Sequence, residues 1–174
     1  MSCRIRLARQ ADAVLLGAME SAAAGRFAGI GLQAIARGRP TGEAEYRRLA
    51  ADGRLWVSEA EEGRLVGLAI GGMVDDQGYL AELSVHPDYG RRGLGRALTA
   101  TVEDWARARA FARLYLTTFR DVPWNRPYYE RLGFVVVAED KAGPELRAIR
   151  QGERARGLDR LSPRVCMVKD LAGA

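Results

Sequence analysis

The sequence predicts an α+β fold in which helices flank a mixed, mostly antiparallel central sheet. Three observations predict it. Strand-like segments separated by short turns occupy residues 54–85, a long amphipathic helix is expected over Leu94–Arg109, and a strand, a short helix and another strand follow within residues 114–137. This order of elements is typical of α+β architecture. A chain of 174 residues can bury one sizeable core, so one domain over residues 1–174 is expected.

The first third of the chain is predicted to be a short strand followed by helices. Residues 4–8 alternate between polar and apolar side chains, which is typical of a strand. Apolar residues recur at helical spacing over Gln10–Ala24, and the glycines that follow break the chain into a loop or two short helical pieces. Thr41 can cap a further helix that runs to Leu49.

The middle of the chain is predicted to be a strand meander. Strands are expected over residues 54–59, 65–74 and Tyr79–Val85. Turns separate them at residues 61–64 and 75–78, and the glycine of the first turn suits a positive φ. The meander therefore supplies neighbouring strands of one sheet.

The second half of the chain begins with the longest amphipathic helix in the sequence. Its apolar face consists of Leu94, Leu98, Val102 and Trp105. Shorter elements follow, namely a strand over 114–119, a helix over 127–132 that ends at Gly133, a strand over 134–137 and a last strand over 161–168. Residues 139–160 mix charges with scattered apolar residues, which predicts a helix or loop on the surface.

The composition excludes several classes of protein. Two cysteines cannot build a disulfide framework or a four-cysteine zinc site, and the single histidine excludes motifs with two histidines, so no metal is expected. No apolar run approaches the roughly 20 residues of a membrane span, and no signal-peptide core follows Met1. We therefore expect a cytoplasmic protein without membrane contact. The net charge of +5 suggests an anionic partner.

The loop between the meander and the long helix predicts a phosphate-binding site. The strand ends at Val85, Pro87 stops it, and Gly93 and Gly95 let the backbone come close to a ligand. The N–H groups of the helix's first turn lack internal partners and, together with the helix dipole, form a cradle for a pyrophosphate. Three arginines of the same loop add positive charge, namely Arg91, Arg92 and Arg96.

Other nucleotide-binding motifs do not fit this loop. No Gly-Lys-Ser/Thr follows the glycines, so the loop is not a P-loop, and Leu98 stands at the third glycine position of a dinucleotide fingerprint. A glycine-containing turn with solvated arginines is the alternative. The agreement of strand, proline, arginines and long helix favours phosphate binding.

Two motifs, in this order, resemble the GNAT superfamily of acyl-CoA-dependent N-acyltransferases. In that family a loop of the form Gln/Arg-x-x-Gly-x-Gly/Ala holds the pyrophosphate of coenzyme A. Gly93 and Gly95 match its small positions, whereas Gly90 departs from its first position. The segment Asn125–Phe134 is similar to the family's second motif, Asn…Tyr-Glu-x-Leu-Gly-Phe, with a shorter spacing from asparagine to tyrosine. The resemblance covers about residues 4–138.

The resemblance implies a GNAT-like fold and an N-acetyltransferase that moves an acetyl group from acetyl-CoA to a primary amine by direct attack, without a covalent enzyme intermediate. It aligns Tyr129 with the family's general acid, which protonates the departing thiolate; a packing tyrosine is the alternative. For the base, strand alternation puts Glu82, Ser84 and His86 on one face, and Glu82 is the best carboxylate. A Glu82 paired with an arginine is the alternative, and His86 or a water chain could serve instead.

The residues expected to bind acetyl-CoA come from both motifs. The resemblance implies that backbone amides near Val85 donate to the thioester carbonyl. For Asn125, an Asx turn or a helix cap is the alternative to a bond with the cofactor. The full set is Leu83, Ser84, Val85, Arg91, Arg92, Gly93, Leu94, Gly95, Arg96, Asn125 and Tyr129.

The acceptor is expected to be a small-molecule amine or a peptide amine. The family places its acceptor pocket near the helices before the second strand, which nominates Glu20, Phe27, Glu43 and Tyr46. The dispersed arginines carry no nucleic-acid-binding motif, so no nucleic-acid partner is expected. The C-terminal strand could pair with a second subunit in a homodimer. The alternative function is a non-catalytic acyl-CoA-binding or regulatory module, which keeps the loop and lacks the chemistry.

Overall fold

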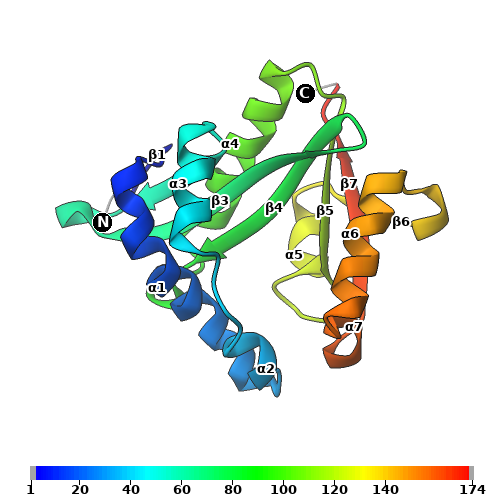
Figure 1. Ribbon diagram of the computed structural model, residues 1–174, viewed down its shortest axis with the longest axis horizontal. Coiled ribbons are helices and arrows are strands. Elements are labelled where there is room, and N and C mark those ends of the chain that lie inside the picture. The colour runs from blue at the N-terminus through cyan, green and yellow to red at the C-terminus, as the bar shows by residue number, and fades with distance from the viewer. Residues whose placement is uncertain (1–2, 173–174) are drawn as a thin grey trace. The chain divides into compact units, whose positions relative to one another are not determined.

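The computed structural model describes residues 3–172, and the two residues at either end of the predicted 1–174 domain lie outside the described part (Figure 1). By its internal contacts the chain divides into two compact units. The first unit comprises Met1–Gly71 and Glu82–Val102, and the second unit comprises Gly72–Ala81 and Glu103–Ala174. Two strands and one long helix contribute residues to both units. The expectation of one domain stays a prediction.

The described residues form a seven-stranded sheet with the order β1-β2-β3-β4-β5-β7-β6. The strands are β1 (Arg4–Leu7), β2 (Leu55–Glu59), β3 (Leu65–Val74), β4 (Gln77–Val85), β5 (Arg113–Phe119), β6 (Val135–Val137) and β7 (Arg164–Asp170). The pairs β1–β2, β2–β3, β5–β7 and β6–β7 are antiparallel, and β4–β5 is parallel. The predicted mixed, mostly antiparallel sheet is therefore confirmed.

The helices also follow the predicted order. The α-helices are α1 (Ala13–Ala24), α2 (Gln33–Ala36), α3 (Glu43–Ala51), α4 (Leu94–Ala108), α5 (Arg126–Arg131), α6 (Pro144–Ala155) and α7 (Leu158–Leu161). Short 3₁₀ turns are η1 (Gln10–Asp12), η2 (Gly25–Ile30), η3 (Glu61–Gly63), η4 (Pro87–Tyr89) and η5 (Glu139–Lys141). Gly63 and Gly133 have φ values of 77° and 91°, as their predicted turn and helix-end positions require.

Two predicted boundaries were wrong. Thr41 does not cap α3, because Gly42 occupies the N-cap and the backbone N–H of Thr41 donates to Glu20 instead. The last strand runs over Arg164–Asp170 and not over 161–168, because α7 extends to Leu161 before β7 aligns with β5.

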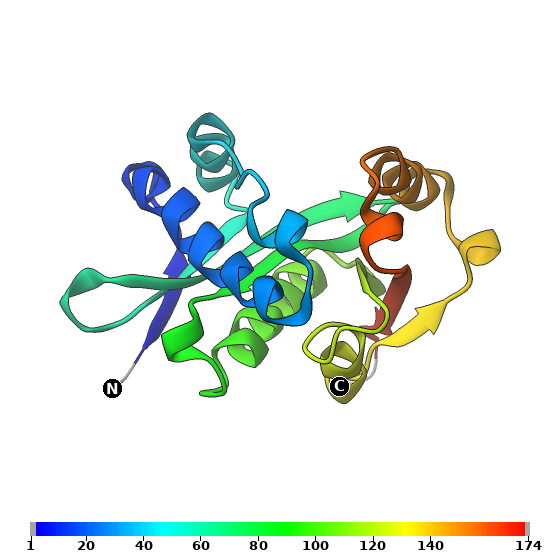
Figure 2. The same cartoon turned by 90° about the horizontal axis from the view of Figure 1, so that it is seen from below.

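The core of the first unit lies between two helices and one face of the sheet. Figure 2 shows α1 and α3 side by side over β2 and β3. The buried side chains that meet there are Leu16 and Met19 of α1, Tyr46 and Leu49 of α3, Leu55 and Val57 of β2, and Leu68 and Ile70 of β3. These positions match the helical and strand periodicities of the sequence.

One helical stretch of the first unit corrects the expectation that no segment approaches the length of a membrane span. The segment Gln10–Ile30 is continuously helical over 21 residues. An 18-residue stretch of it has a mean hydropathy of 1.2, and 22% of that stretch is buried. By length and composition it meets the criterion for a span, and it is the one such helix among the described residues. The core helix of a soluble protein meets the same criterion, so this finding alone indicates little.

The second unit packs α6 against strands through a small apolar cluster. Val74, Ala142, Leu146 and Cys166 are buried together, and four half-buried side chains lie against them, namely Tyr79, Tyr115, Val137 and Ile149. The turn after β3 fixes the start of α6. The Asp75 carboxylate accepts the N–H groups of Glu145 (2.9 Å) and Leu146 (3.1 Å), and Glu145 in turn accepts the N–H of Asp75. Asp75 therefore caps α6 from a distant part of the chain.

We expect Gly143→Ala to lower the free energy of unfolding by about 1–2 kcal/mol, because the new Cβ would overlap the Asp75 carboxylate and displace this cap. Gly152→Ala, inside the same helix, is the matched control. Its Cβ meets nothing within 4 Å, so the change should stabilise the protein by about 0.5–1 kcal/mol through helix propensity. Urea unfolding measures the free energy of unfolding of both variants. An equal change in the two variants would contradict the capping role of Asp75.

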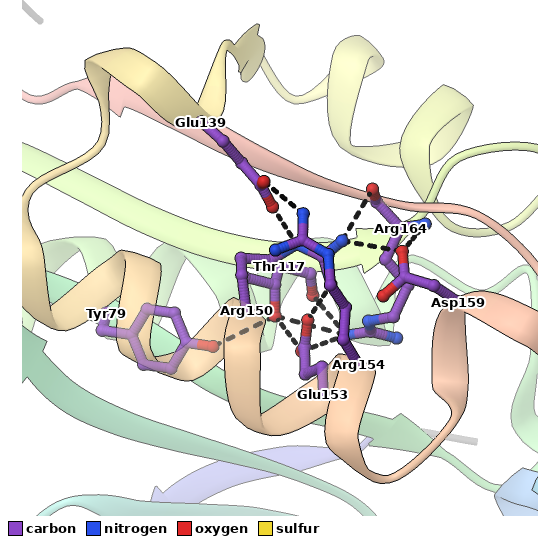
Figure 3. Close-up of polar contacts among 8 residues, drawn as sticks. All are labelled: Tyr79, Thr117, Glu139, Arg150, Glu153, Arg154, Asp159 and Arg164. Atoms are coloured by element: carbon purple, nitrogen blue, oxygen red, sulfur yellow. Dashed lines mark hydrogen bonds and ion pairs between the residues drawn. The ribbon is translucent and has the colours of Figure 1, made fainter.

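A buried ion network in the second unit ties α6 and α7 to β5 and β7 (Figure 3). Arg150 is only 2% exposed and donates to Glu139 (2.9 Å), Glu153 (2.5 Å) and Asp159 (2.7 Å). Glu153 also accepts from Arg164 (2.8 Å) and from the hydroxyl of Thr117 (2.6 Å).

This network corrects the prediction for residues 139–160, which are not simply a surface segment. Arg150 and Glu153 are buried. Leu146, Arg150 and Glu153 recur at i, i+4 and i+7, so they form one helix face on which charged residues replace apolar ones. Their mutual pairing makes this burial tolerable.

The ion network predicts a loss of stability in acid. Burial alone would raise the pKa of Glu153, but Arg164, Thr117 and Arg150 outweigh it and hold that pKa below its ordinary value. A carboxyl whose pKa is lower in the folded state stabilises the protein above its unfolded pKa and loses this contribution as the pH falls. We expect unfolding free energy to decrease below about pH 5, and less steeply in Glu153→Gln. Urea unfolding at several pH values tests this, and parallel curves for both proteins would contradict it.

Candidate functional site

The first unit carries the predicted phosphate-binding loop at the end of β4. The backbone N–H of His86 donates to Val66 at 2.8 Å, which holds the strand end against β3. The His86 ring nitrogen Nδ1 accepts the N–H of Asp88 at 3.3 Å, so this side chain caps η4. The structure therefore gives His86 a capping role, whereas the sequence analysis named it as an alternative base.

The loop itself has the backbone geometry of an anion cradle. Arg91 has a φ of 59° and Gly93 a φ of 80°, so two left-handed residues flank Arg92. Such alternation turns successive N–H groups toward one side and makes an anion-binding concavity. The N–H groups of the first turn of α4 follow directly, and the bond from Ala97 to Gly93 (3.0 Å) is the first to close a helical turn. This arrangement fits a pyrophosphate.

The side chains of the loop divide into anchors and exposed cations. Leu94 and Leu98 are buried and fix the start of α4, so Leu94 can offer a ligand its backbone N–H only. Arg91, Arg92 and Arg96 are exposed. Their charges can therefore reach an anion in solution.

Sequence analysis missed two residues beside this loop. Two guanidinium groups lie over the Tyr89 ring, with Arg92 at 5.2 Å and Arg64 at 5.8 Å from its centroid. Arg64 precedes β3 and is far from the loop in sequence, and only the pairing of the strands brings it there. No sequence signal could have found it.

Glu82 and Ser84 share one face of β4, as strand alternation predicted. The Ser84 hydroxyl donates to Glu82 Oε1 at 2.8 Å, and Ser84 is buried while Glu82 is half-buried. Gly67 of the neighbouring strand β3 packs closely against this part of β4. A Cβ on Gly67 would lie 3.2 Å from the Ser84 carbonyl oxygen and 3.1 Å from the Leu98 side chain. Glu82 is thus a carboxylate oriented by a neighbouring hydroxyl.

Two of the four acceptor-side candidates come together near Glu82. Tyr46 is fully buried and its hydroxyl donates to Glu20, which also accepts the N–H of Thr41 at 3.2 Å. Burial raises the pKa of Tyr46, and the carboxylates of Glu20 and Glu82 raise it further. The other two candidates lie apart. Glu43 pairs with Arg47 at 2.7 Å on the surface, and Phe27 is half-buried in η2.

The second unit carries the other motif, in which Asn125 has an unexpected partner. Asn125 occupies the N-cap of α5, but its side chain makes no capping bond. Instead its Nδ2 donates to the Thr118 hydroxyl at 2.7 Å, and its Oδ1 is buried with no hydrogen-bond partner among the described residues. The side-chain cap alternative is therefore wrong. A buried acceptor without a donor fits a ligand that carries an amide N–H, as coenzyme A does.

Tyr129 follows in the same helix and is held firmly. It is 9% exposed, and its ring packs edge-on against Phe134 at 5.7 Å and Tyr128 at 5.3 Å between centroids. Its backbone carbonyl accepts the N–H groups of Leu132 and Phe134, which close the end of α5. Its role as an acid stays a prediction.

Two other kinds of site, a cysteine nucleophile and a metal centre, find little support in the described residues. Burial raises the pKa of the Cys166 thiol to about 11, so this cysteine is protonated at neutral pH and is a poor nucleophile. Within residues 3–172, no three His, Cys, Asp or Glu side chains gather in a way that could hold a metal ion.

Sequence comparison agrees with the loop and the second motif. Residues 32–134, more than half of the chain, match the acetyltransferase (GNAT) family. The [ribosomal protein bS18]-alanine N-acetyltransferase of Escherichia coli K12 is 36% identical over 74 residues, which are 42% of this chain and 50% of that protein. The chain thus matches about half the length of such curated relatives.

Solved structures share the fold. N-acetylglutamate synthase of Neisseria gonorrhoeae, solved with coenzyme A and N-acetylglutamate, superposes with a TM-score of 0.72 at 24% identity over 99% of this chain and 36% of its own. The PaiA N-acetyltransferase of Thermoplasma acidophilum, solved with coenzyme A, superposes with a TM-score of 0.70 at 17% identity over 98% of this chain and 99% of its own. This likeness shows the fold, and the family match over more than half of the chain shows that the chain belongs to the GNAT acetyltransferase family.

Proposed function

We propose that this protein is an N-acetyltransferase that transfers the acetyl group of acetyl-CoA to a primary amine. The observation that carries the proposal is the loop before α4, where left-handed Arg91 and Gly93 turn backbone N–H groups outward beside exposed arginines. Such a loop binds a pyrophosphate through its backbone and adds charge from its side chains. Family membership supports the same cofactor.

The residues of each motif have a proposed role toward acetyl-CoA. The backbone N–H groups of Arg91–Arg96 would bind the pyrophosphate, and the unpartnered Oδ1 of Asn125 would accept an amide N–H of the pantetheine arm. The backbone of Leu83–Val85 would orient the thioester, and an N–H near Val85 would stabilise the oxyanion. When bound, acetyl-CoA supplies the activated acetyl group.

Two side chains would handle the protons of the reaction. Glu82, oriented by Ser84, accepts a proton from the acceptor ammonium so that the free amine can attack the thioester carbonyl. As the tetrahedral intermediate collapses, the carbon–sulfur bond breaks and the Tyr129 hydroxyl protonates the thiolate. The amine attacks directly, so no acetyl-enzyme forms. The second proton of the ammonium leaves the nitrogen for solvent as the amide forms, and Tyr129 regains a proton from solvent.

The acceptor is a primary amine of a small molecule or of a peptide. A relative that is named as an N-acetyltransferase for an alanine of ribosomal protein bS18 favours a peptide amine. A cytoplasmic location, a homodimer, and the absence of metal, nucleic-acid and membrane partners stay predictions. The C-terminal strand is not a free edge for such a homodimer, because β7 pairs with β5 on one side and with β6 on the other.

A panel of amines and N-terminal peptides tests the function. Incubation with acetyl-CoA should release free thiol with at least one acceptor, and acetyl-CoA should raise the melting temperature. A non-catalytic acyl-CoA-binding module would show the rise in melting temperature without thiol release from any acceptor. The absence of both thiol release and a rise in melting temperature would contradict both functions.

A further inference from the structure

The first unit contains a surface segment that carries only positive charge. We call residues 25–39 the basic segment; it comprises η2, α2 and the turns beside them, and α1 runs directly into it (Figure 1). Between Ser21 and Gly42 the sequence has no Asp or Glu, but it has three arginines, all of them exposed: Arg26, Arg37 and Arg39. Strong charge of one sign over a short stretch attracts a partner of the opposite sign.

Two of these arginines differ from the arginines that follow them in the chain. Nearby side chains are engaged at short range, as Arg47 is with Glu43 and Arg48 with Glu45. Within the described part of the chain, the side chains of Arg37 and Arg39 have neither a hydrogen bond nor an ion pair. Their charges are therefore available to a ligand.

The basic segment is held against α1 at its C-terminal end. A Cβ on Gly17 would lie 3.7 Å from the Pro40 ring, and the N–H of Thr41 donates to Glu20 of α1. The buried Tyr46 hydroxyl donates to the same carboxylate. Arg39 is thus two residues from a fixed point on Glu20, and its backbone cannot move far from it.

This fixed point lies close to the proposed base. The negative charge of Glu82 acts on the Tyr46 hydroxyl, which bonds to Glu20. Two carboxylates, Glu20 and Glu82, therefore act on the Tyr46 hydroxyl, and the basic segment is joined to Glu20 through the N–H of Thr41. A ligand that suits this order of charges has an ammonium group at one end and carboxylates further along.

We propose that the acceptor is an acidic polypeptide, in which a free N-terminal amine is followed within a few residues by Asp or Glu side chains that bind the basic segment. The inference rests on the proposed function. Arg37, Arg39 and the exposed Ile30 are spread along one segment, which suits an extended peptide with acidic and apolar side chains better than one small anion. Ile30, 43% exposed in the same segment, offers an apolar contact to a peptide side chain.

The test compares peptides that share one N-terminal residue and differ in the next three residues, which are acidic, neutral or arginine. Arginine is used because a lysine side chain is itself an acceptor amine. We expect kcat/KM to be about tenfold higher for the acidic than for the arginine peptide. In Arg37→Ala/Arg39→Ala this ratio should fall to about twofold, and high salt should lower it in the parent protein. Because the readout is a ratio, a general loss of activity cancels.

A matched control removes equal charge elsewhere. Arg156→Ala/Arg160→Ala takes two exposed arginines from the second unit and should keep the parent ratio. Equal rates for acidic and arginine peptides, an unchanged ratio in Arg37→Ala/Arg39→Ala, or free glutamate acetylated as efficiently as the acidic peptide would each overturn the inference while leaving the proposed function intact. No acetylation of any amine would overturn both.

Discussion

Replacing Glu82 by glutamine is expected to lower kcat by about 100- to 1,000-fold, because the variant keeps the shape of the side chain and its bond with Ser84 but cannot accept a proton. The parent rate should fall as the pH decreases, since protonation of the base abolishes its function. The acid limb of the pH–rate profile should therefore disappear in Glu82→Gln. Initial rates of thiol release across a pH series measure both effects.

Glu45→Gln is the control for this substitution. Glu45 is exposed on α3 and pairs with Arg48 at 2.5 Å, so the variant should keep the parent rate and the parent pH profile. An acid limb that persists in Glu82→Gln would assign the proton transfer to another group, with His86 as the next candidate.

Replacing Tyr129 by phenylalanine is expected to lower kcat by about 100-fold or more without weakening acetyl-CoA binding. The phenyl ring keeps the edge-on contacts with Phe134 and Tyr128, so α5 should stay in place. Only the proton donor for the thiolate is lost. Pre-steady-state rates, together with acetyl-CoA titration by calorimetry, separate chemistry from binding.

Tyr128→Phe is the matched control, because Tyr128 is the neighbour of Tyr129 on the same helix and lies outside the predicted machinery. It should retain most of the parent kcat. An unchanged kcat in Tyr129→Phe, with normal acetyl-CoA binding, would remove Tyr129 from the mechanism and leave it a packing residue.

The fold was largely predictable because its elements have clear local causes. The meander has strand alternation and turn residues, α4 has a continuous apolar face, and Gly133 ends α5 in a left-handed conformation. The β4–α4 loop was predictable for the same reason, since its glycines and its position between a strand and a helix are both visible in the sequence. Strand alternation also put Glu82 and Ser84 on one face, where a hydrogen bond joins them.

The remaining features depend on contacts between residues that are distant in the chain. Arg150 and Glu153 look like surface residues until the carboxylates and arginines around them are known. Arg64 reaches Tyr89 only through strand pairing, and Asn125 turns to Thr118 and not to its own helix. Tyr46 can bond to Glu20 of α1 because the N–H of Thr41 also bonds to Glu20 and so holds the start of α3 near α1. No local periodicity specifies such partners.

The most direct test of the central claim follows the acetyl group itself. The protein is incubated with acetyl-CoA that carries an isotopically labelled acetyl group and with a set of N-terminal peptides, and mass spectrometry then locates the label. The account predicts labelled acetyl on the peptide amine, one free CoA thiol for each acetyl transferred, and no label on the protein as an intermediate. Bound CoA with no labelled amine, or label that passes through a cysteine of the protein, would contradict it.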